Sequence, residues 1–276
     1  MTHKELTAEG YRIDWGNATW LAALHIAAMA TLVAMAHESF ATPAYIIGLV
    51  WWWLSNTAIG AGYHRFFSHP THKARWPVQI FYLLLGGGSF QGPARRWADQ
   101  HRAHHAFSDE ARDPYSVRRG FWWAHLWWIV YRSPYAKQWH KSLDLSQSRL
   151  VLWQERFYIR VAVFGGLVLP TLVGWYFGCP WQTLLVAGPL RIAVQLHQVG
   201  CVNSIAHWFG EQTSLLSSAR NGSWWLAVLG FGENARHADH HLHQNNYRID
   251  PDWFGFDPGK WFIETASTLG LAYDLH

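Results

Sequence analysis

Long apolar runs alternate along this chain with polar segments rich in histidine. The runs cover 20–36, 43–62, 161–177 and 181–203, and each is close to the ~20 residues that a helix needs to cross a bilayer. Short connections, HESFATP and YFGCPWQ, join them in pairs. We therefore predict an all-α integral membrane protein with four transmembrane helices in two hairpins.

The positions of lysine and arginine predict the orientation. Both short connections lack these residues, whereas the segments before the first run, between the second and third, and after the fourth contain nearly all of them. Cytoplasmic loops retain positive charge. We expect cytoplasmic termini and a helical cytoplasmic cap, defined as 63–157 and 204–276, within one domain spanning 1–276. The opening MTHKELTAEGYRID lacks the pattern of a signal peptide, so we expect a multi-pass protein of the bacterial inner membrane.

The amino-acid composition limits the kinds of molecule that this protein is expected to bind. The chain has 20 Trp and 18 His in 276 residues, which favours a membrane interface or an aromatic cavity together with metal or proton chemistry. Its pI is near 9.1, yet the basic residues form no RNA-binding signature. We expect membrane lipid or phosphate groups as partners and no nucleic acid. Cys179 and Cys201 are too few for a disulfide framework, and Arg191, inside the fourth run, predicts a buried salt bridge.

Two segments share one histidine pattern. HRAHH supplies His101, His104 and His105, and HADHH supplies His237, His240 and His241. Offsets of three and four residues place side chains on one face of a helix, so one helix can offer three metal ligands.

Two further histidine segments follow apolar runs. At 1.5 Å per residue, Pro43 to His64 spans roughly 32 Å and Trp181 to His207 roughly 39 Å, so both histidines should emerge on the cytoplasmic side. In HRFFSH, His64 and His69 are five residues apart, which on a regular helix suits two neighbouring ions better than one. Asn203 lies four residues before His207 and shares its face.

Nine imidazoles and one amide suffice for two metal ions. Neutral imidazole suits iron, copper, nickel and zinc, whereas magnesium and calcium require carboxylates. Structural zinc would use four ligands, commonly with cysteine. We interpret the remaining histidines as ordinary polar groups; these are His3, His25, His37, His72, His125, His140, His197, His243 and His276.

The motifs GYHRFFSHPTHKA, SFQGPARRWADQHRAHHAFSD, RRGFWWAHLWW, VNSIAHWFG, GENARHADHH and LGLAYDLH resemble, in order and spacing, the membrane fatty acid desaturases of the acyl-CoA delta-9 type, similar to stearoyl-CoA desaturase. The resemblance runs from about Ile13 to the C-terminus. It implies two iron ions, one held by His64, His105, His207, His237 and His241. The other would be held by His69, His101, His104 and His240, with Asn203 acting through a water.

The resemblance also implies an activity and its partners. The chain would use molecular oxygen to introduce a cis double bond into a saturated acyl chain, with acyl-CoA the expected substrate. Two electrons would come from an external donor such as a b-type cytochrome, a rubredoxin or a ferredoxin with its reductase.

Substrate contacts follow from the same resemblance. Gln91 and Trp97 match positions that line the bend of the acyl tunnel, and Arg102, Arg118 and Arg119 are candidates for binding a phosphate-bearing head group. Trp52, twelve residues before His64 and thus about 18 Å away along a helix, is expected to limit acyl chain length. Arg96 and Tyr115 depart from the family pattern, which has an acidic residue and a histidine there. Acyl carrier protein or lipid could therefore replace coenzyme A.

Two other functions remain open. A related di-iron enzyme could hydroxylate the acyl chain or form an alkyne or a terminal alkene, because substrate placement decides the outcome. A non-catalytic membrane protein that handles zinc belongs to a different class.

Overall fold

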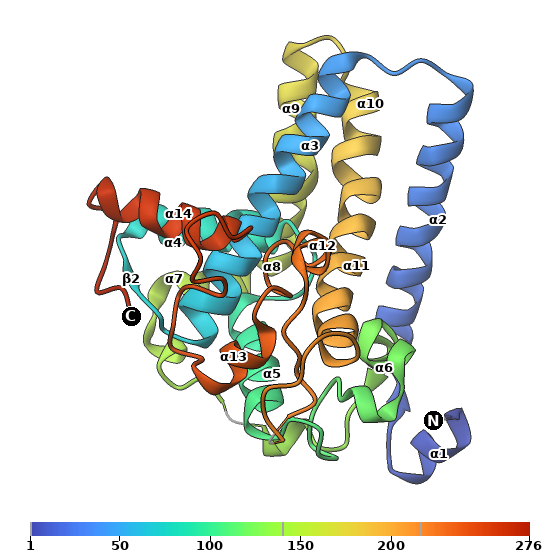
Figure 1. Cartoon of the computed structure of the whole chain (residues 1–276). Helices are drawn as coiled ribbons and strands as arrows, with labels where there is room; N and C mark the ends of the chain where they lie inside the picture. The colour runs from blue at the N-terminus through green and yellow to red at the C-terminus, as the bar shows by residue number, and fades with distance from the viewer. Residues whose placement is uncertain (1, 140, 216) are drawn as a thin grey trace.

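A computed structural model describes residues 2–139, 141–215 and 217–276 (Figure 1). His140, expected to be an ordinary polar histidine, lies outside the described residues. The structure is mostly helical. Its α-helices are α1 (His3–Ala8), α2 (Trp15–His37), α3 (Thr42–Thr57), α4 (Trp76–Gly87), α5 (Ala94–Ala106), α6 (Phe121–His125), α7 (Arg149–Arg156), α8 (Tyr158–Val163), α9 (Leu169–Tyr176), α10 (Pro180–Leu185), α11 (Arg191–Ser204), α12 (Trp224–Leu229), α13 (His237–Leu242) and α14 (Pro258–Thr268).

Shorter elements complete the chain. The π-helices are η1 (Ala58–Ser68), η6 (Phe164–Val168) and η7 (Val186–Leu190), and the 3₁₀ turns are η2 (Val117–Arg119), η3 (Trp127–Val130), η4 (Ala136–Gln138), η5 (Leu145–Gln147) and η8 (Ile205–His207). Two antiparallel ladders of two residues each join β1 (Arg12–Ile13) to β3 (Tyr131–Arg132) and β2 (Lys73–Ala74) to β4 (Ala272–Tyr273). These ladders fasten both ends of the chain to the cap and were not predicted.

Three helical stretches are long and apolar enough to cross a membrane: Trp15–His37, Tyr158–Tyr176 and Pro180–His207. They match the first, third and fourth predicted spans. The second, 43–62, is helical as α3 and η1 but is not among these three. It contains three tryptophans followed by Ser55, Asn56 and Thr57, which lower its mean hydropathy. In Figure 1, α3 stands beside α9 and α10, and it contacts both.

Local signals explain where these helices begin. Asp14 caps α2 by accepting a hydrogen bond from the Asn17 backbone N–H at 3.2 Å, as expected for an N-cap carboxylate. Pro43 and Pro180 occupy the first turns of α3 and α10, where the missing N–H has no helical partner to lose.

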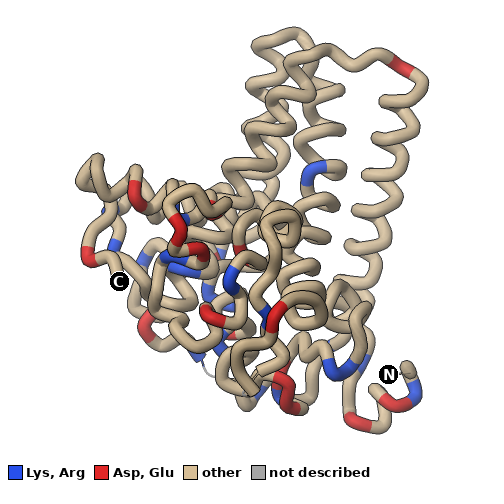
Figure 2. Tube along the Cα trace, in the orientation of Figure 1, with Lys and Arg blue, Asp and Glu red and all other residues tan. Residues whose placement is uncertain are grey.

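Charged residues are concentrated at the cap end of the molecule. Figure 2 shows lysine, arginine, aspartate and glutamate over the cap and near the N-terminus, whereas the upper ends of the long helices are almost free of them. This distribution agrees with the charge asymmetry of the sequence.

Arg191 is buried inside the helix bundle, with 3% of its surface exposed, and the expected salt bridge is wrong. Its guanidinium donates to the carbonyl oxygens of Gly88 at 3.1 Å and Gly166 at 3.0 Å, and to Gln195 Oε1 at 3.1 Å. Within the described ranges, no carboxylate bonds to it. Neutral carbonyls therefore satisfy a buried cation, and Gly88 lies at the carboxyl end of α4, where the helix dipole favours positive charge.

Candidate metal centre

The nine histidines predicted as ligands lie together in two groups. The first contains His64, His69, His101, His105 and His240, and the second contains His104, His207, His237 and His241. Within each group, one nitrogen per ring lies within 4.8 Å of the others. The rings come from η1 and the residue that follows it, His69, and from α5, η8 and α13. These segments lie far apart in the sequence, and the fold brings them together.

Both HxxHH segments are helical, as predicted, and both divide their histidines in the same way. In α5, His101 and His105 join the first group and His104 joins the second. In α13, His237 and His241 join the second group and His240 joins the first. Each helix thus gives an i, i+4 pair to one group and its third ring to the other. This exchange explains why the pattern occurs twice.

His64 and His69 fall in the same group, and the expectation that they serve different ions stays a prediction. The expectation assumed a regular α-helix, but η1 is a π-helix. The backbone N–H of His69 donates to the carbonyl of His64 at 3.2 Å, which is the i→i+5 bond of that geometry. A spacing of five residues therefore returns to one side of the helix.

The grouping also differs from the ligand sets implied by the resemblance. Those sets placed His64 and His105 with His207, and His104 with His69. Which ion each ring binds stays a prediction. In the structure, His64 and His105 share a group without His207, and His104 and His69 lie in different groups. The reason is the π-turn at His64, together with the i, i+4 geometry that keeps His105 beside His101.

The ionisation of these rings suits metal ligation. Burial lowers the pKa of His237 to about 3, and it lowers the pKa of His69, His101, His105, His240 and His241 below the usual histidine value. Neutral imidazole nitrogens are the form that binds metal.

Ring nitrogens from different elements also lie directly against one another. Nε2 of His64 lies 2.9 Å from Nε2 of His240, and Nε2 of His101 lies 2.8 Å from Nε2 of His69. In the described chain, His105 Nε2 and His241 Nε2 are buried without a hydrogen-bond partner. Such convergent imidazole nitrogens fit first-row metal ions.

A buried carboxylate orients the ring of His64. Glu233 Oε2 accepts from His64 Nδ1 at 2.7 Å, and Glu233 Oε1 pairs with Arg65 at 2.8 Å. Arg65 also pairs with Asp257 at 2.7 Å. Burial would raise the pKa of Glu233, but Arg65 and His64 outweigh it and lower the pKa to about 2. The ionised carboxylate keeps the proton on Nδ1 and turns Nε2 toward the group.

Other rings have partners of the same kind. Asp113 lies 3.0 Å from His104 Nδ1, Tyr115 Oη lies 3.0 Å from His101 Nδ1, and Ser218 Oγ lies 2.9 Å from His207 Nδ1. The sequence reasoning missed Glu233, Asp113 and Ser218 in this role. Glu233 and Asp113 stand a few residues from histidine boxes, and that proximity is the signal that would have indicated them.

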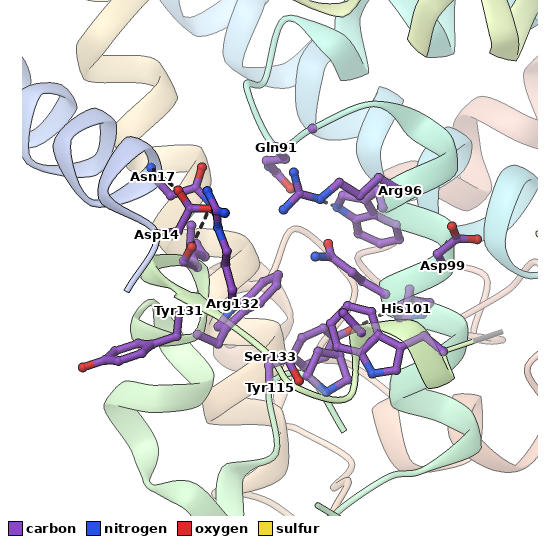
Figure 3. A pocket seen from close by; sticks show the side chains of 18 of the residues that line it. Asp14, Asn17, Gln91, Arg96, Asp99, His101, Tyr115, Tyr131, Arg132 and Ser133 are labelled. Carbon is purple, nitrogen blue, oxygen red and sulfur yellow. Dashed lines mark hydrogen bonds and ion pairs between the residues drawn. The ribbon is translucent and has the colours of Figure 1, made fainter. Parts of the chain in front are cut away.

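A cavity of about 1150 Å³ adjoins the first group and contains His101 in its wall. Figure 3 shows Gln91, Arg96 and Tyr115 around it together with His101. Its apolar lining includes Trp20, Phe90, Ile129 and Leu196, and its basic lining comprises Arg12, Arg96, Arg132, Lys137 and Lys141. The cavity thus combines an apolar interior with cationic side chains.

Some of the predicted substrate residues line this cavity and others do not. Gln91 and Trp97 line the cavity, as does Asn203; Trp97 Nε1 donates to Gln91 Oε1 at 3.2 Å, and its ring stacks on His101 with centroids 5.0 Å apart.

The other four candidates do not line this cavity. Arg102 pairs with Asp144 at 2.8 Å, Arg119 pairs with Glu9 at 2.7 Å, and Arg118 is exposed. Trp52 packs against Phe231.

Comparison with known proteins decides the family. The model of the family described as fatty acid desaturase matches residues 38–246. The chain belongs to the fatty acid desaturase family. It is 33% identical to human stearoyl-CoA desaturase, over 99% of this chain and 77% of that protein. It is 34% identical to acyl-CoA desaturase 1 of Saccharomyces cerevisiae over 84% of this chain.

The relatives differ from this chain in length and source. The chain spans 46% of the Saccharomyces cerevisiae desaturase and 55% of a probable acyl-CoA desaturase of Schizosaccharomyces pombe, that is, about half of each. These family members come from fungi and animals, so they lend no support to a bacterial inner membrane.

Proposed function

We propose that this chain is an oxygen-dependent fatty acyl desaturase that introduces a cis double bond, delta-9-like, into a saturated acyl chain. One observation carries the proposal: in a member of the desaturase family, two groups of mostly buried histidines lie together, and one of them adjoins a largely apolar cavity with a basic lining. Acyl-CoA fits this cavity best, because its chain is apolar and its carrier is phosphorylated.

We assign one iron ion to each histidine group, with Asn203 contributing through a water. When bound, the irons would supply the activation of dioxygen and the removal of two hydrogens from adjacent methylenes. The outer carboxylates Glu233 and Asp113 hold the tautomers of His64 and His104, and Trp97 and Gln91 position the acyl chain beside His101. A substrate that fills the cavity excludes bulk water from the centre.

The head group and the electron donor bind on the basic side of the molecule in this proposal. Arg12, Arg96, Lys137 and Lys141 line the cavity and are better placed for a carrier phosphate than Arg102 and Arg119, which are paired with acids. A b-type cytochrome, rubredoxin or ferredoxin would dock on the cap and deliver two electrons.

The membrane arrangement is part of the proposal. We infer that α3 with the start of η1 forms a fourth span beside the three apolar helices, giving two hairpins and cytoplasmic termini. Its contacts with α9, α10 and α11 support this inference, as does the scarcity of charge at the upper ends of the helices (Figure 2).

Two alternative functions can be distinguished from a desaturase by the product formed and by the metal bound. A hydroxylase, acetylenase or terminal-alkene-forming enzyme would share the same ligands and yield a different product from the same substrate. A zinc-handling protein would contain zinc and consume no oxygen.

The test uses the purified full chain in lipid with acyl-CoA, oxygen and an electron donor, and mass spectrometry of the products. We expect a monounsaturated acyl product and iron in the protein. His104→Ala and His240→Ala should each abolish turnover and lower the iron content, because each removes a ligand from one group. His37→Ala, at an exposed position, is the matched control and should change neither. Equal activity in all three variants would contradict the ligand assignment.

A further inference from the structure

Three histidines that the metal centre does not use form a hydrogen-bonded chain across the bundle. His25 Nε2 of α2 lies 3.1 Å from His197 Nε2 of α11, and His197 Nδ1 lies 3.0 Å from His125 Nε2 of α6. Their spacing along the chain does not connect them, because 172 residues separate His25 from His197.

Both ends of this hydrogen-bonded row of histidines lead to backbone carbonyl oxygens. At one end, His25 Nδ1 lies 2.7 Å from the carbonyl oxygen of Leu21. At the other, His125 Nδ1 lies 3.0 Å from Ser204 Oγ, and that hydroxyl donates to the carbonyl oxygen of Gly200 at 2.7 Å. A backbone carbonyl can only accept, so each end requires a hydrogen from the histidine chain.

A count of hydrogens shows that three neutral histidine rings cannot complete every hydrogen bond in this row. The five links from Leu21 to Gly200 each need one hydrogen. A neutral imidazole supplies one and a serine hydroxyl supplies one, so three rings and Ser204 supply four. One link must then bring two lone pairs face to face. One added proton completes all five links, and a second would force two N–H groups together.

We propose that His25, His197 and His125 form a one-proton store in the wall of the substrate cavity. The added proton can sit on any of the three rings with all five hydrogen bonds kept, so the rings share it and titrate as one unit. His125, Gly200 and Asn203 line the cavity, which places one end of the store beside it. Burial and the neighbouring His197 lower the pKa of His125, so a proton at this end is held weakly.

Other ionisable groups on the elements packed around the rings have partners of their own or lie elsewhere. Among the described residues, the hydrogen bonds of the three rings are the links given above. The other ionisable side chains on α2, α11, η2 and η8 are His37, Arg191, Cys201, Arg118, Arg119 and His207. Arg191 bonds backbone carbonyls, Arg119 pairs with Glu9, and His207 bonds Ser218.

The store has a use in the proposed reaction, and this step rests on the proposed function. Forming –CH=CH– from –CH₂–CH₂– while dioxygen becomes two waters takes two electrons from the donor and two protons from the surroundings. The cavity is closed to bulk water when substrate fills it. The store supplies one of the two protons and is refilled between turnovers.

The first experiment follows the pH titration of the imidazoles by NMR in the full chain, labelled with ¹⁵N-histidine, in lipid nanodiscs and with zinc in place of paramagnetic metal. We expect the three rings to share one midpoint and to take up one proton in total. His25→Phe leaves three links and three hydrogens, so the remaining rings should lose the shared midpoint; His197→Phe should do the same. His37→Phe, on the same helix, is the control. Three independent midpoints in the unmodified chain, or uptake of more than one proton, would overturn the store.

The second experiment measures turnover against pH. The store is full below its midpoint and empties as pH rises through it, so the rate of the unmodified enzyme should fall there. His25→Phe should lower kcat by about a hundredfold below the midpoint, the low end for a positioned proton donor, with unchanged KM and metal content. An unchanged kcat would overturn the catalytic role. Absence of any product from the unmodified chain would contradict the proposed function, and the NMR titration would still decide the store.

Discussion

The indole of Trp52 is held in a fixed position on α3. Its Nε1 donates to Gln198 Oε1 of α11 at 2.6 Å, and its ring contacts that of Phe231 with centroids 5.3 Å apart. Asn56 donates to the same Gln198 oxygen at 3.1 Å. A half-buried indole fixed from two sides is rigid. Trp52 lies outside the lining of the cavity described above, so its role in limiting acyl chain length stays a prediction.

Trp52→Ala should therefore shift the products toward longer acyl chains. The change removes the indole and leaves space between α3 and α11, at a cost of about 3–5 kcal/mol in stability if the site does not collapse. Product profiles from a series of saturated acyl-CoA chain lengths measure the shift. Trp175→Ala, at a position 70% exposed, is the control for losing a tryptophan. An unchanged chain-length profile would reject the role of Trp52.

Single residues show what the sequence could and could not predict. The nine ligand candidates were recognisable because ligand spacing recurs in HRAHH and HADHH. Their division into groups was not, because it depends on a π-turn at His64 that hydrophobic periodicity does not reveal. His25, His125 and His197 looked ordinary one by one, since only the packing of α2, α6 and α11 joins them.

At the level of elements, α4 and η1 interlock through two glycines and two tyrosines. A Cβ atom at Gly62 would lie 2.5 Å from Tyr82, and one at Gly86 would clash with the ring of Tyr63. Both tyrosines are fully buried. The glycines thus let the two helices approach closely, and η1 carries His64.

Gly62→Ala should disturb the metal centre from outside it. The added methyl cannot fit against the Cβ and ring of Tyr82, so η1 must move, and overpacking of this kind costs about 1–3 kcal/mol. We expect a lower apparent Tm and a lower iron content. Gly16→Ala, whose Cβ would meet only Asp14 at 3.4 Å, should change neither. Normal iron content in Gly62→Ala would show that this contact does not position His64.

Secondary-structure elements were predicted best where the pattern of apolar or histidine positions covered several helical turns or recurred. The apolar runs and both HxxHH helices were confirmed as helices, whereas the two-residue ladders were missed because such short strands carry no periodicity. The salt bridge expected at Arg191 failed for a related reason. Backbone carbonyls, which every residue has, satisfy that cation, and a sequence does not show which of them are free.

The whole molecule depends on the histidine groups to join its parts. Rings from η1, α5, η8 and α13 converge on two points, so a metal pair would link the ends of the bundle helices to two cap helices. Without metal, facing rings such as His64 with His240 and His69 with His101 are joined only by single hydrogen bonds of 2.8–2.9 Å. Metal binding should therefore be a large part of the stability of the native state.

Removing the metal should lower the apparent Tm substantially. A ligand present at a thousand times its Kd stabilises the folded state by about 4 kcal/mol, which for a chain of this size corresponds to roughly 8–16 °C. Thermal unfolding of the detergent-solubilised protein before and after chelation measures the change, and ferrous iron should restore the original value. Magnesium is the control, because a site of imidazoles without carboxylate ligands does not suit it. A Tm that is unaffected by chelation, in protein shown to have lost its metal, would mean that the histidine groups do not hold the helices together.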